Sequence, residues 1–519
     1  MFRFRRCAGS SNTGVYPKVT KGRWQSGQIL VLTTMSLFAL IGFIALAVDV
    51  GFLYNARRRM QTAADAASIA GANAQQGSNS ATYQQAAQDV ATINGFTNGQ
   101  SGVTVTVGPP ATAPNPTTAT YVEVDIAQAV PTFFMGVIGY KTMNVSAHAI
   151  AGTVNNPACV YALDPSASSA ISANGNFNIN AACGIIDDSS SASALQAVGN
   201  GTITATAMGV TGNYSAGGNV TLSPTPKTSL APSPDPLASR AAPTVPSYSL
   251  LPTNKSSKKT LSGGYDNVTL TPGIYPNGIT LSGTSENVTV NAGNYGNGIT
   301  IKGNGGSVTL NPGQYQNTGT SASISIQGNG TKVTFNPGSY TFVGPVVVSN
   351  CNVTFQPGLY EGGIQISGNP TVTFSAGTYI LAGGGLSISG NSTMSGTGVT
   401  FYNTSGLTAY APISLSGNET ANLSAPTSGP MEGILFFQDR AVPLGSAGST
   451  IVGNSSSSFD GVLYFPTTAL SYAGNSSLSG YTTIVADKLS FSGNGSVTLG
   501  DNYSSLADGS PIKSTTLYE

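Results

Sequence analysis

The sequence predicts a mainly β protein, with a single transmembrane helix and a small α+β domain at the N-terminus, followed by a right-handed parallel β-helix. Residues 29–48 form one uncharged apolar segment, which is long enough to cross a bilayer once. The 65 Gly and 29 Pro residues favour a turn-rich β architecture over long runs of helices. A motif of about 20 residues recurs between residues 267 and 379, and this period is typical of a solenoid.

Charge is scarce and unevenly distributed. Asp, Glu, Lys and Arg make up 8% of the chain, against roughly 25% in ordinary soluble domains. The net charge is zero, but residues 1–60 carry nine basic side chains and one acidic one. Such asymmetry is typical of membrane or nucleic-acid contact, and the apolar segment that follows the basic residues favours the membrane. We therefore expect no nucleic-acid partner, and we interpret Arg57-Arg58-Arg59 as a membrane-interface flank.

The apolar segment is predicted to be a retained anchor. Six basic residues precede it and three follow it, which predicts a cytoplasmic tail at residues 1–26 and places the bulk of the chain outside the cytoplasm. The alternative is a cleaved signal peptide, because Ala45-Leu46-Ala47 has the small-x-small form that signal peptidase reads. The apolar run is longer than the 7 to 15 residues or so of a signal core. A mature chain that begins at Val48 would contradict the anchor.

Small residues follow the anchor at spacings of three and four, which predicts that the helix continues to about residue 75 with one packing face. Two interpretations remain open: this face packs on a second copy or a partner subunit, or the helix is a stiff alanine-rich stalk. The face consists of Leu53, Ala56, Met60, Ala63, Ala67, Ala70 and Ala74.

Residues 27–75 also carry a family resemblance. Gly27-Gln28 opens the apolar run, Val48-Asp49-Val50-Gly51 closes it, and residues 60–71 read MQTAADAASIAG. This pattern resembles the N-terminal domain of the TadE/TadG-like proteins of Flp (tight adherence) pilus assembly. The motif residues are Gly27, Asp49, Gly51, Gln61 and Asp65.

The resemblance extends to residues 76–152, which are similar to the family's small extracytoplasmic α+β domain. It implies a non-enzymatic, membrane-anchored component of a pilus or cell-envelope machine in the bacterial cytoplasmic membrane, with pilus-assembly or envelope proteins as partners. Type IV prepilins carry Glu at the fifth position after the cleaved Gly, whereas this chain has Leu32 there. That difference argues against processing by a prepilin peptidase.

Two segments separate this region from the repeats. Residues 153–223 are β-patterned, and Cys159 and Cys183 are expected to form a disulfide in an oxidising compartment, the alternative being two buried free thiols. Residues 224–260 contain eight prolines up to Pro252, and this composition predicts an extended linker.

Residues 261–503 are predicted to form the solenoid, with residues 504–519 as a tail. Each unit contains a strand that reads V-T followed by a large apolar residue, then a Pro-Gly or Ala-Gly corner, a tyrosine and a second alternating strand. We therefore expect two strands per turn and about 12 turns. Recurrent Gly-Asn pairs predict a second corner at which asparagine side chains stack. After Gly396 the tyrosine spacing is lost, and a β-sandwich is the alternative for that part. The repeat tyrosines are Tyr275, Tyr295, Tyr315, Tyr340, Tyr360 and Tyr379.

A catalytic site is not expected. Parallel β-helices include pectin-degrading enzymes, but the predicted solenoid has no His and its acidic residues are scattered singly. The adjacent acids Asp187 and Asp188 are interpreted as a turn or cap, and His148, the one His, as structural. We therefore expect no enzyme activity, cofactor or metal. The predicted function is that of an envelope or pilus-assembly component whose solenoid is a spacer or binds a surface or glycan ligand; the alternatives are a surface adhesin with a borrowed anchor and a polysaccharide-active enzyme.

Overall fold

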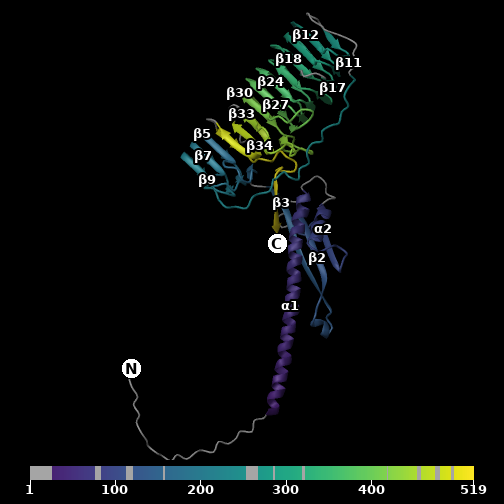
Figure 1. Cartoon of the computed structure of the whole chain (residues 1–519), viewed down its shortest axis with the longest axis vertical. Coiled ribbons are helices and arrows are strands. Elements are labelled where there is room, and N and C mark those ends of the chain that lie inside the picture. Colours follow the sequence, from purple (N-terminus) through teal and green to yellow (C-terminus); the bar gives the residue numbers. More distant parts are fainter. Residues whose placement is uncertain are drawn as a thin grey trace, which may run out of the picture.

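The computed structural model describes residues 26–75, 83–112, 121–155, 158–252, 267–284, 287–317, 322–417, 419–452, 457–473, 480–492 and 496–518. The predicted cytoplasmic tail up to residue 25, residues 253–260 of the predicted linker and the first residues of the predicted solenoid lie outside these ranges. One long helix carries a small domain, and a stack of short strands lies beyond its C-terminal end (Figure 1).

Helix α1 runs from Ser26 to Gln75, so the anchor and the alanine-rich segment form one continuous helix. It is long and apolar enough to cross a membrane, and the side chains from Leu30 to Phe52 are largely exposed within the chain. From about residue 53 onward one face is buried. Met60, Ala63 and Ala67 on this face pack on the chain's own small domain, so the interpretation that the face packs on a second copy or a partner subunit is wrong.

The small domain consists of α2 (Tyr83–Ile93) and a four-stranded antiparallel sheet in the order β1-β2-β3-β37. Apolar residues that alternate along β2 and β3 pack on the alanine face of α1. The predicted C-terminal tail supplies the fourth strand, because Ile150 pairs with Tyr518 and Asn155 with Lys513. The sheet therefore combines strands that precede the solenoid in the chain with one that follows it. The strands are β1 (Val103–Gly108), β2 (Tyr121–Pro131), β3 (Thr142–Asn155) and β37 (Lys513–Tyr518).

The described strands from β4 to β36 form a parallel β-solenoid of about 14 turns. Stacked at about 4.8 Å per turn, it is roughly 65 Å long. Each regular turn contributes three strands rather than the predicted two, because the segment that ends in tyrosine is itself a strand. The turns after Gly396 continue the same parallel pairing, so this part is not a β-sandwich.

The strands of the solenoid fall into three columns in the regular turns. The first column contains β10 (Val268–Leu270), β13 (Asn287–Val290), β16 (Ser307–Leu310), β19 (Lys332–Phe335), β22 (Asn352–Phe355), β25 (Thr371–Phe374), β28 (Thr393–Thr397) and β31 (Thr420–Ser424). The second contains β11 (Gly273–Tyr275), β14 (Gly293–Tyr295), β17 (Gly313–Gln316), β20 (Tyr340–Val343), β23 (Gly358–Glu361), β26 (Gly377–Ala382), β29 (Val399–Thr404) and β32 (Ile434–Gln438). The third contains β12 (Ile279–Thr284), β15 (Ile299–Asn304), β18 (Ile324–Gln327), β21 (Val346–Ser349), β24 (Ile364–Gly368), β27 (Leu386–Gly390), β30 (Ile413–Gly417) and β33 (Ser449–Val452). The last turns are built from β34 (Ser458–Ala473), β35 (Thr482–Ser492) and β36 (Ser496–Leu499), followed in space by β4 (Ala158–Ala162), β5 (Ile171–Ala181), β6 (Gly184–Asp187), β7 (Leu195–Thr204), β8 (Met208–Val210) and β9 (Tyr214–Ser223).

The repeat tyrosines point into the core and close the Pro-Gly corner. Each phenol donates a hydrogen bond to the carbonyl four residues earlier, as in Tyr295 to Asn291 at 2.6 Å and Tyr340 to Asn336 at 2.7 Å. An asparagine ladder runs along this corner, since the Asn311 amide donates to Asn291 Oδ1 at 2.7 Å and the Asn336 amide donates to Asn311 Oδ1 at 2.7 Å. The ladder between side chains lies at the Pro-Gly corner, whereas at the predicted Gly-Asn corner backbone amides donate to asparagine side chains of the preceding turn, as in Asn329 N to Asn304 Oδ1 and Asn369 N to Asn350 Oδ1, both at 3.2 Å.

The turns are not stacked in chain order. Strand β35 pairs in parallel with β4 and β5, and β36 pairs with β5, so residues 158–223 continue the stack beyond its C-terminal turn. The segment that we expected to be a separate β-rich unit is therefore part of the solenoid (Figure 1). It contains Cys159 and Cys183, which form a disulfide with Cα atoms 5.6 Å apart.

Residues 224–252, called the strap here, run back along the stack to its far end (Figure 1). An extended proline-rich path of 29 residues reaches roughly 90 Å, which exceeds the length of the stack. The strap is held by side chains of the solenoid: the Asn294 amide donates to Pro252 O at 2.7 Å, and Leu251 N donates to Gln316 Oε1 at 2.6 Å. The predicted linker is therefore docked along much of its length rather than separating two independent halves.

Glu419 is fully buried at a corner of the solenoid, and neither carboxylate oxygen has a hydrogen-bond partner among the described residues. Burial raises the pKa of this carboxyl to about 7 from its ordinary value of 4.5. The folded protein therefore binds a proton that the unfolded chain releases, and stability falls as the pH rises from 4.5 to 7 and stays reduced above it.

We expect Glu419→Gln to stabilise the protein by about 1–2 kcal/mol at pH 8 and to have little effect at pH 4, since the amide is neutral at both values. Urea unfolding at the two pH values measures the difference. Glu123→Gln, at a half-buried position of β2 in the small domain, is the control. A stabilisation of equal size at both pH values would contradict the assignment to ionisation.

Candidate functional site at the membrane end of the small domain

Asp49 joins the outer end of the apolar segment to the small domain. Its carboxylate is 1% exposed and accepts hydrogen bonds from three successive backbone amides, Phe133 and Phe134 at 2.9 Å and Met135 at 2.6 Å. These amides open the 3₁₀ helix η1 (Met135–Ile138) in the loop between β2 and β3. A carboxylate at such an N-terminus satisfies donors that have no partner within the helix. Asp49 therefore fixes the loop against α1.

Asp49→Asn is expected to loosen this loop, because one carboxylate oxygen is replaced by an amide donor that faces backbone donors. Hydrogen exchange of the Phe134 and Met135 amides should accelerate by about tenfold or more, while the strands of the solenoid keep their protection. Asp89→Asn, on the exposed side of α2, is the matched control. Unchanged exchange in the loop would show that Asp49 does not hold it.

Gln61 and Asp65, further along α1, form a second connection between this helix and the small domain. The Gln61 amide donates to Asp65 Oδ1 at 2.8 Å and to the backbone carbonyl of His148 on β3 at 2.8 Å. This contact links α1 to the middle of the sheet. With Tyr54, Arg57 and Arg58 these residues line an open cavity of about 460 Å³.

The two glycines of the motif both lie on α1. Gly27 lies in the first turn of α1. A Cβ at Gly51 would meet no atom within 4 Å, so its surface is open to lipid or to another protein. Gly71 differs, since a Cβ there would lie 2.9 Å from Val122 Cγ1 and 3.3 Å from Ala87 Cβ. The helix therefore packs closely against α2 and β2 at Gly71.

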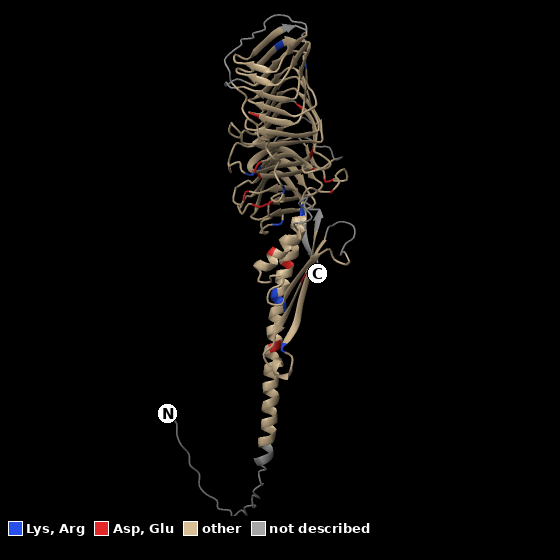
Figure 2. Cartoon of the chain, turned by 90° about the vertical axis from the view of Figure 1, so that its right-hand side faces the viewer, with Lys and Arg blue, Asp and Glu red and all other residues tan. Residues whose placement is uncertain are grey.

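The charged residues cluster around the small domain and near its junction with the stack, while the upper turns of the solenoid carry few (Figure 2). Arg57, Arg58 and Arg59 are exposed on α1. They follow Asp49 by eight to ten residues, which is about 12–15 Å along the helix axis. This position fits the headgroup region outside a membrane whose apolar core ends near Asp49.

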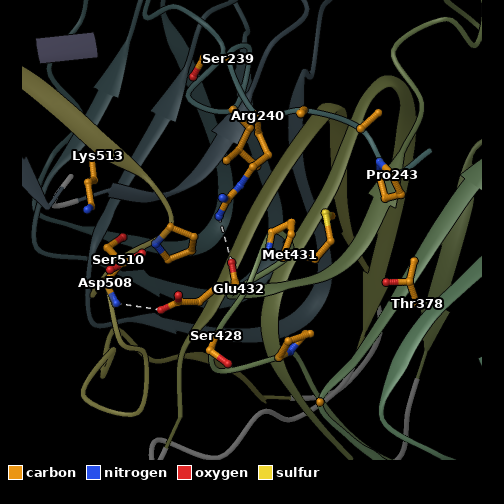
Figure 3. Close-up of a pocket in the computed structure, with 18 of the residues that line it drawn as sticks. Ser239, Arg240, Pro243, Thr378, Ser428, Met431, Glu432, Asp508, Ser510 and Lys513 are labelled. Atoms are coloured by element: carbon orange, nitrogen blue, oxygen red, sulfur yellow. Dashed lines mark hydrogen bonds between the residues drawn. The ribbon is translucent and has the colours of Figure 1, made fainter. Parts of the chain in front are cut away.

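A larger cavity of about 940 Å³ lies where the strap, the solenoid and the segment before β37 meet (Figure 3). The Arg240 guanidinium donates to the carbonyl oxygen of Glu432 at 3.0 Å, and Asp508 N donates to Glu432 Oε1 at 2.8 Å. Burial lowers the pKa of Arg240, while the nearby acids Glu432 and Asp508 oppose that shift. Prolines and glycines line this cavity, and Glu432 bonds both to the strap and to the segment before β37. The residues of the cavity therefore join these segments to the solenoid.

The adjacent acids Asp187 and Asp188 each accept a hydrogen bond from a backbone amide. Burial raises the pKa of Asp187 to about 6, and its Oδ1 accepts a hydrogen bond from Ser189 N at 3.0 Å in a turn. Asp188 Oδ1 accepts a bond from Ser233 N of the strap at 2.8 Å. Burial also raises the pKa of the Cys351 thiol, to about 11, which keeps it a weak nucleophile. No group of three or more His, Cys, Asp or Glu residues that could hold a metal ion occurs within the described ranges.

The sequence pattern indicates Asp49, Gln61 and Asp65 but not their partners. These partners are backbone groups of the β2–β3 loop and of β3, about 85 residues away along the chain. The signal that could have found the loop is its composition, since residues 133–140 contain no charged residue yet follow the end of a strand.

Residues 27–74 match the family model of putative Flp pilus-assembly TadE/G-like proteins. Residues 61–151 match that of putative Tad-like Flp pilus-assembly proteins. These matches confirm the resemblance and cover α1 and the small domain up to β3. No curated protein and no solved structure gives a significant match to the chain.

Proposed function

We propose that the protein is a non-enzymatic component of a Flp/Tad-type pilus or of its assembly machinery in the cell envelope. Helix α1 anchors it in the cytoplasmic membrane with the N-terminus in the cytoplasm, and the solenoid is held outside the cytoplasm. The family matches to residues 27–151 support the pilus assignment. The 20-residue apolar stretch of α1 supports the anchor.

The observation that carries this proposal is the pairing of β37 with β3. The solenoid is an insertion between two neighbouring strands of the Tad-matching domain, and the chain returns into the same sheet after it. The solenoid is therefore attached at two points, so it is a fixed head on a helical stalk rather than a flexible tail. Such a head suits the presentation of a binding or assembly surface at a set height above the membrane.

The pairing of β3 with β37 also allows the solenoid to be deleted while the small domain is kept. Asn155 lies opposite Lys513, so a turn of about four residues can replace the segment between them and convert β3 and β37 into a hairpin. This headless variant keeps α1 and the complete small domain. A truncation at residue 261 would instead remove β37 and damage the domain that is to be kept.

The test compares three strains of the producing bacterium: wild type, a gene deletion and the headless variant. We expect the gene deletion to lower the amount of pilin that can be sheared from the cell surface. Protease applied to spheroplasts should degrade the head and spare an N-terminal tag. Unchanged piliation in the gene deletion would contradict a pilus role. If surface attachment then fell in both mutants, the result would favour the adhesin alternative.

A further inference from the structure

The β2–β3 loop, residues 132–141, exposes an unusual amount of apolar surface. Val137 is 85% exposed, Ile138 73%, Phe133 61% and Tyr140 59%. The loop is not loosely structured, because Thr132 N donates to Lys141 O at 3.1 Å and the Thr132 hydroxyl donates to Tyr140 O. Gly139, with φ of +103°, ends the 3₁₀ turn in a conformation that other residues rarely adopt. The apolar side chains are thus presented on a defined turn.

This turn lies beside α1 at the level where the apolar segment ends. The three hydrogen bonds to Asp49 place it there, and the rings of Phe52 and Phe133 meet edge to face at 5.3 Å. Strands β2 and β3 run down along α1 toward its N-terminal half, so the loop is the part of the small domain closest to the anchor (Figure 1). Any bilayer that covers the apolar segment up to Val48 must therefore meet the loop.

The charges around the loop follow the pattern of a membrane interface. No charged residue lies between Phe133 and Tyr140, and the exposed Lys141 follows directly. Arg57 to Arg59 lie further from the apolar segment on α1. Aromatic residues at the boundary of the apolar core with basic residues just outside it are typical of interfacial anchors.

We infer that the β2–β3 loop inserts into the outer interface of the bilayer that α1 crosses, with Val137 and Ile138 among the acyl chains and Lys141 at the lipid phosphates. This inference rests on the proposed anchoring by α1. Because Asp49 ties the loop to the helix, the two contacts form one rigid foot. A second interfacial contact fixes the tilt and rotation of the helix, which a single span leaves free. The head is then held in one orientation above the membrane.

The test uses the full chain with Trp24 replaced by Phe, so that a new tryptophan is the only one. Ile138→Trp and Tyr140→Trp place the probe in the loop, and Tyr140→Trp is the conservative change. Leu444→Trp, at a solenoid position that is 74% exposed, is the control. Single copies are reconstituted in nanodiscs with lipids brominated on their acyl chains, so that lipid is the only apolar partner offered to the loop.

We expect bromolipids to lower the fluorescence of both loop probes by about twofold or more and to leave the Leu444→Trp probe unchanged, with aqueous iodide giving the opposite pattern. Loop probes that are quenched by iodide and not by bromolipid would overturn the inference and point to a protein partner or a second copy. Flotation of the chain with liposomes reports the anchor separately. A chain that floats without loop quenching contradicts only the insertion, whereas a chain that does not float contradicts the anchoring itself.

Discussion

Tyr315→Ala is expected to destabilise the middle of the solenoid by about 3–5 kcal/mol, the range for large aromatic residues replaced in a core. The Tyr315 ring is fully buried and stacks on Tyr295 at 6.3 Å, Tyr340 at 6.4 Å and Phe342 at 5.2 Å. Its hydroxyl donates to Asn311 O at 2.6 Å and Val290 O at 2.9 Å. The substitution therefore removes contacts to the turns on both sides and leaves two carbonyls without this donor.

Tyr315→Phe separates the two contributions. It keeps the stacked ring and removes the hydroxyl, so we expect a loss of about 1–2 kcal/mol. Burial raises the pKa of Tyr315, so the wild-type hydroxyl remains a donor throughout the pH range of the measurement.

The control is Tyr275→Ala, the same substitution at the end of the stack. Tyr275 stacks on Tyr295 at 5.0 Å in the outermost described turn at that end and has no repeat tyrosine on its other side. In a solenoid each turn is stabilised chiefly by its neighbours, so Tyr275→Ala should cost clearly less than Tyr315→Ala. Hydrogen exchange resolved by turn is the appropriate readout, because long repeat arrays need not unfold in one step. Equal effects at both positions would contradict the nearest-neighbour account.

The sequence predicts those features that depend on local pattern. The apolar run of α1, the alternation of valine and phenylalanine in each turn and the Pro-Gly corner are all local, and the structure has each of them. The third strand of each turn was missed because its short Gly-x-Tyr form resembles a turn. The hydroxyl of the buried tyrosine donates a hydrogen bond to the carbonyl only four residues earlier, so this contact is also local.

The features that the sequence does not predict are pairings between distant segments. Stacking of one turn on the next depends on matching strands and not on chain order, so β4 and β5 can follow β35 in space. Strand β37 has no distinctive pattern, and its partner β3 lies some 360 residues earlier. For the candidate site the pattern identifies Asp49, but three backbone amides that bind it carry no sequence signal.

Arg440→Ala is expected to release the strap from the side of the solenoid. Arg440 lies in the loop after β32, and its guanidinium donates to two strap carbonyls, Arg240 O at 3.0 Å and Leu237 O. It also lies 5.1 Å from the centre of the Tyr464 ring, and the Tyr464 hydroxyl donates to Asp235 Oδ2 at 2.6 Å. One side chain thus joins the strap to two elements of the stack.

We expect the free energy of unfolding to fall by about 2–4 kcal/mol, since several charge-assisted hydrogen bonds disappear together. In addition, Leu237, which is buried in the wild type, becomes accessible to water. The effect should be local: limited proteolysis should cut residues 228–248 in the variant and not in the wild type. Arg440→Lys keeps the charge but cannot reach both carbonyls with a planar fork, so it should rescue only part of the loss.

Lys302→Ala removes an exposed cation on β15, away from the described contacts of the strap, and is the matched control for lost positive charge. A strap that stays protected in Arg440→Ala would mean that its other contacts, such as those with Asn294, Gln316 and Glu432, hold it without Arg440. The outcome also bears on the order of the turns. The strap is the covalent path by which residues 158–223 and 268–499 form one stack, so a docked strap shortens the search for that pairing and a released one should slow refolding of the stack.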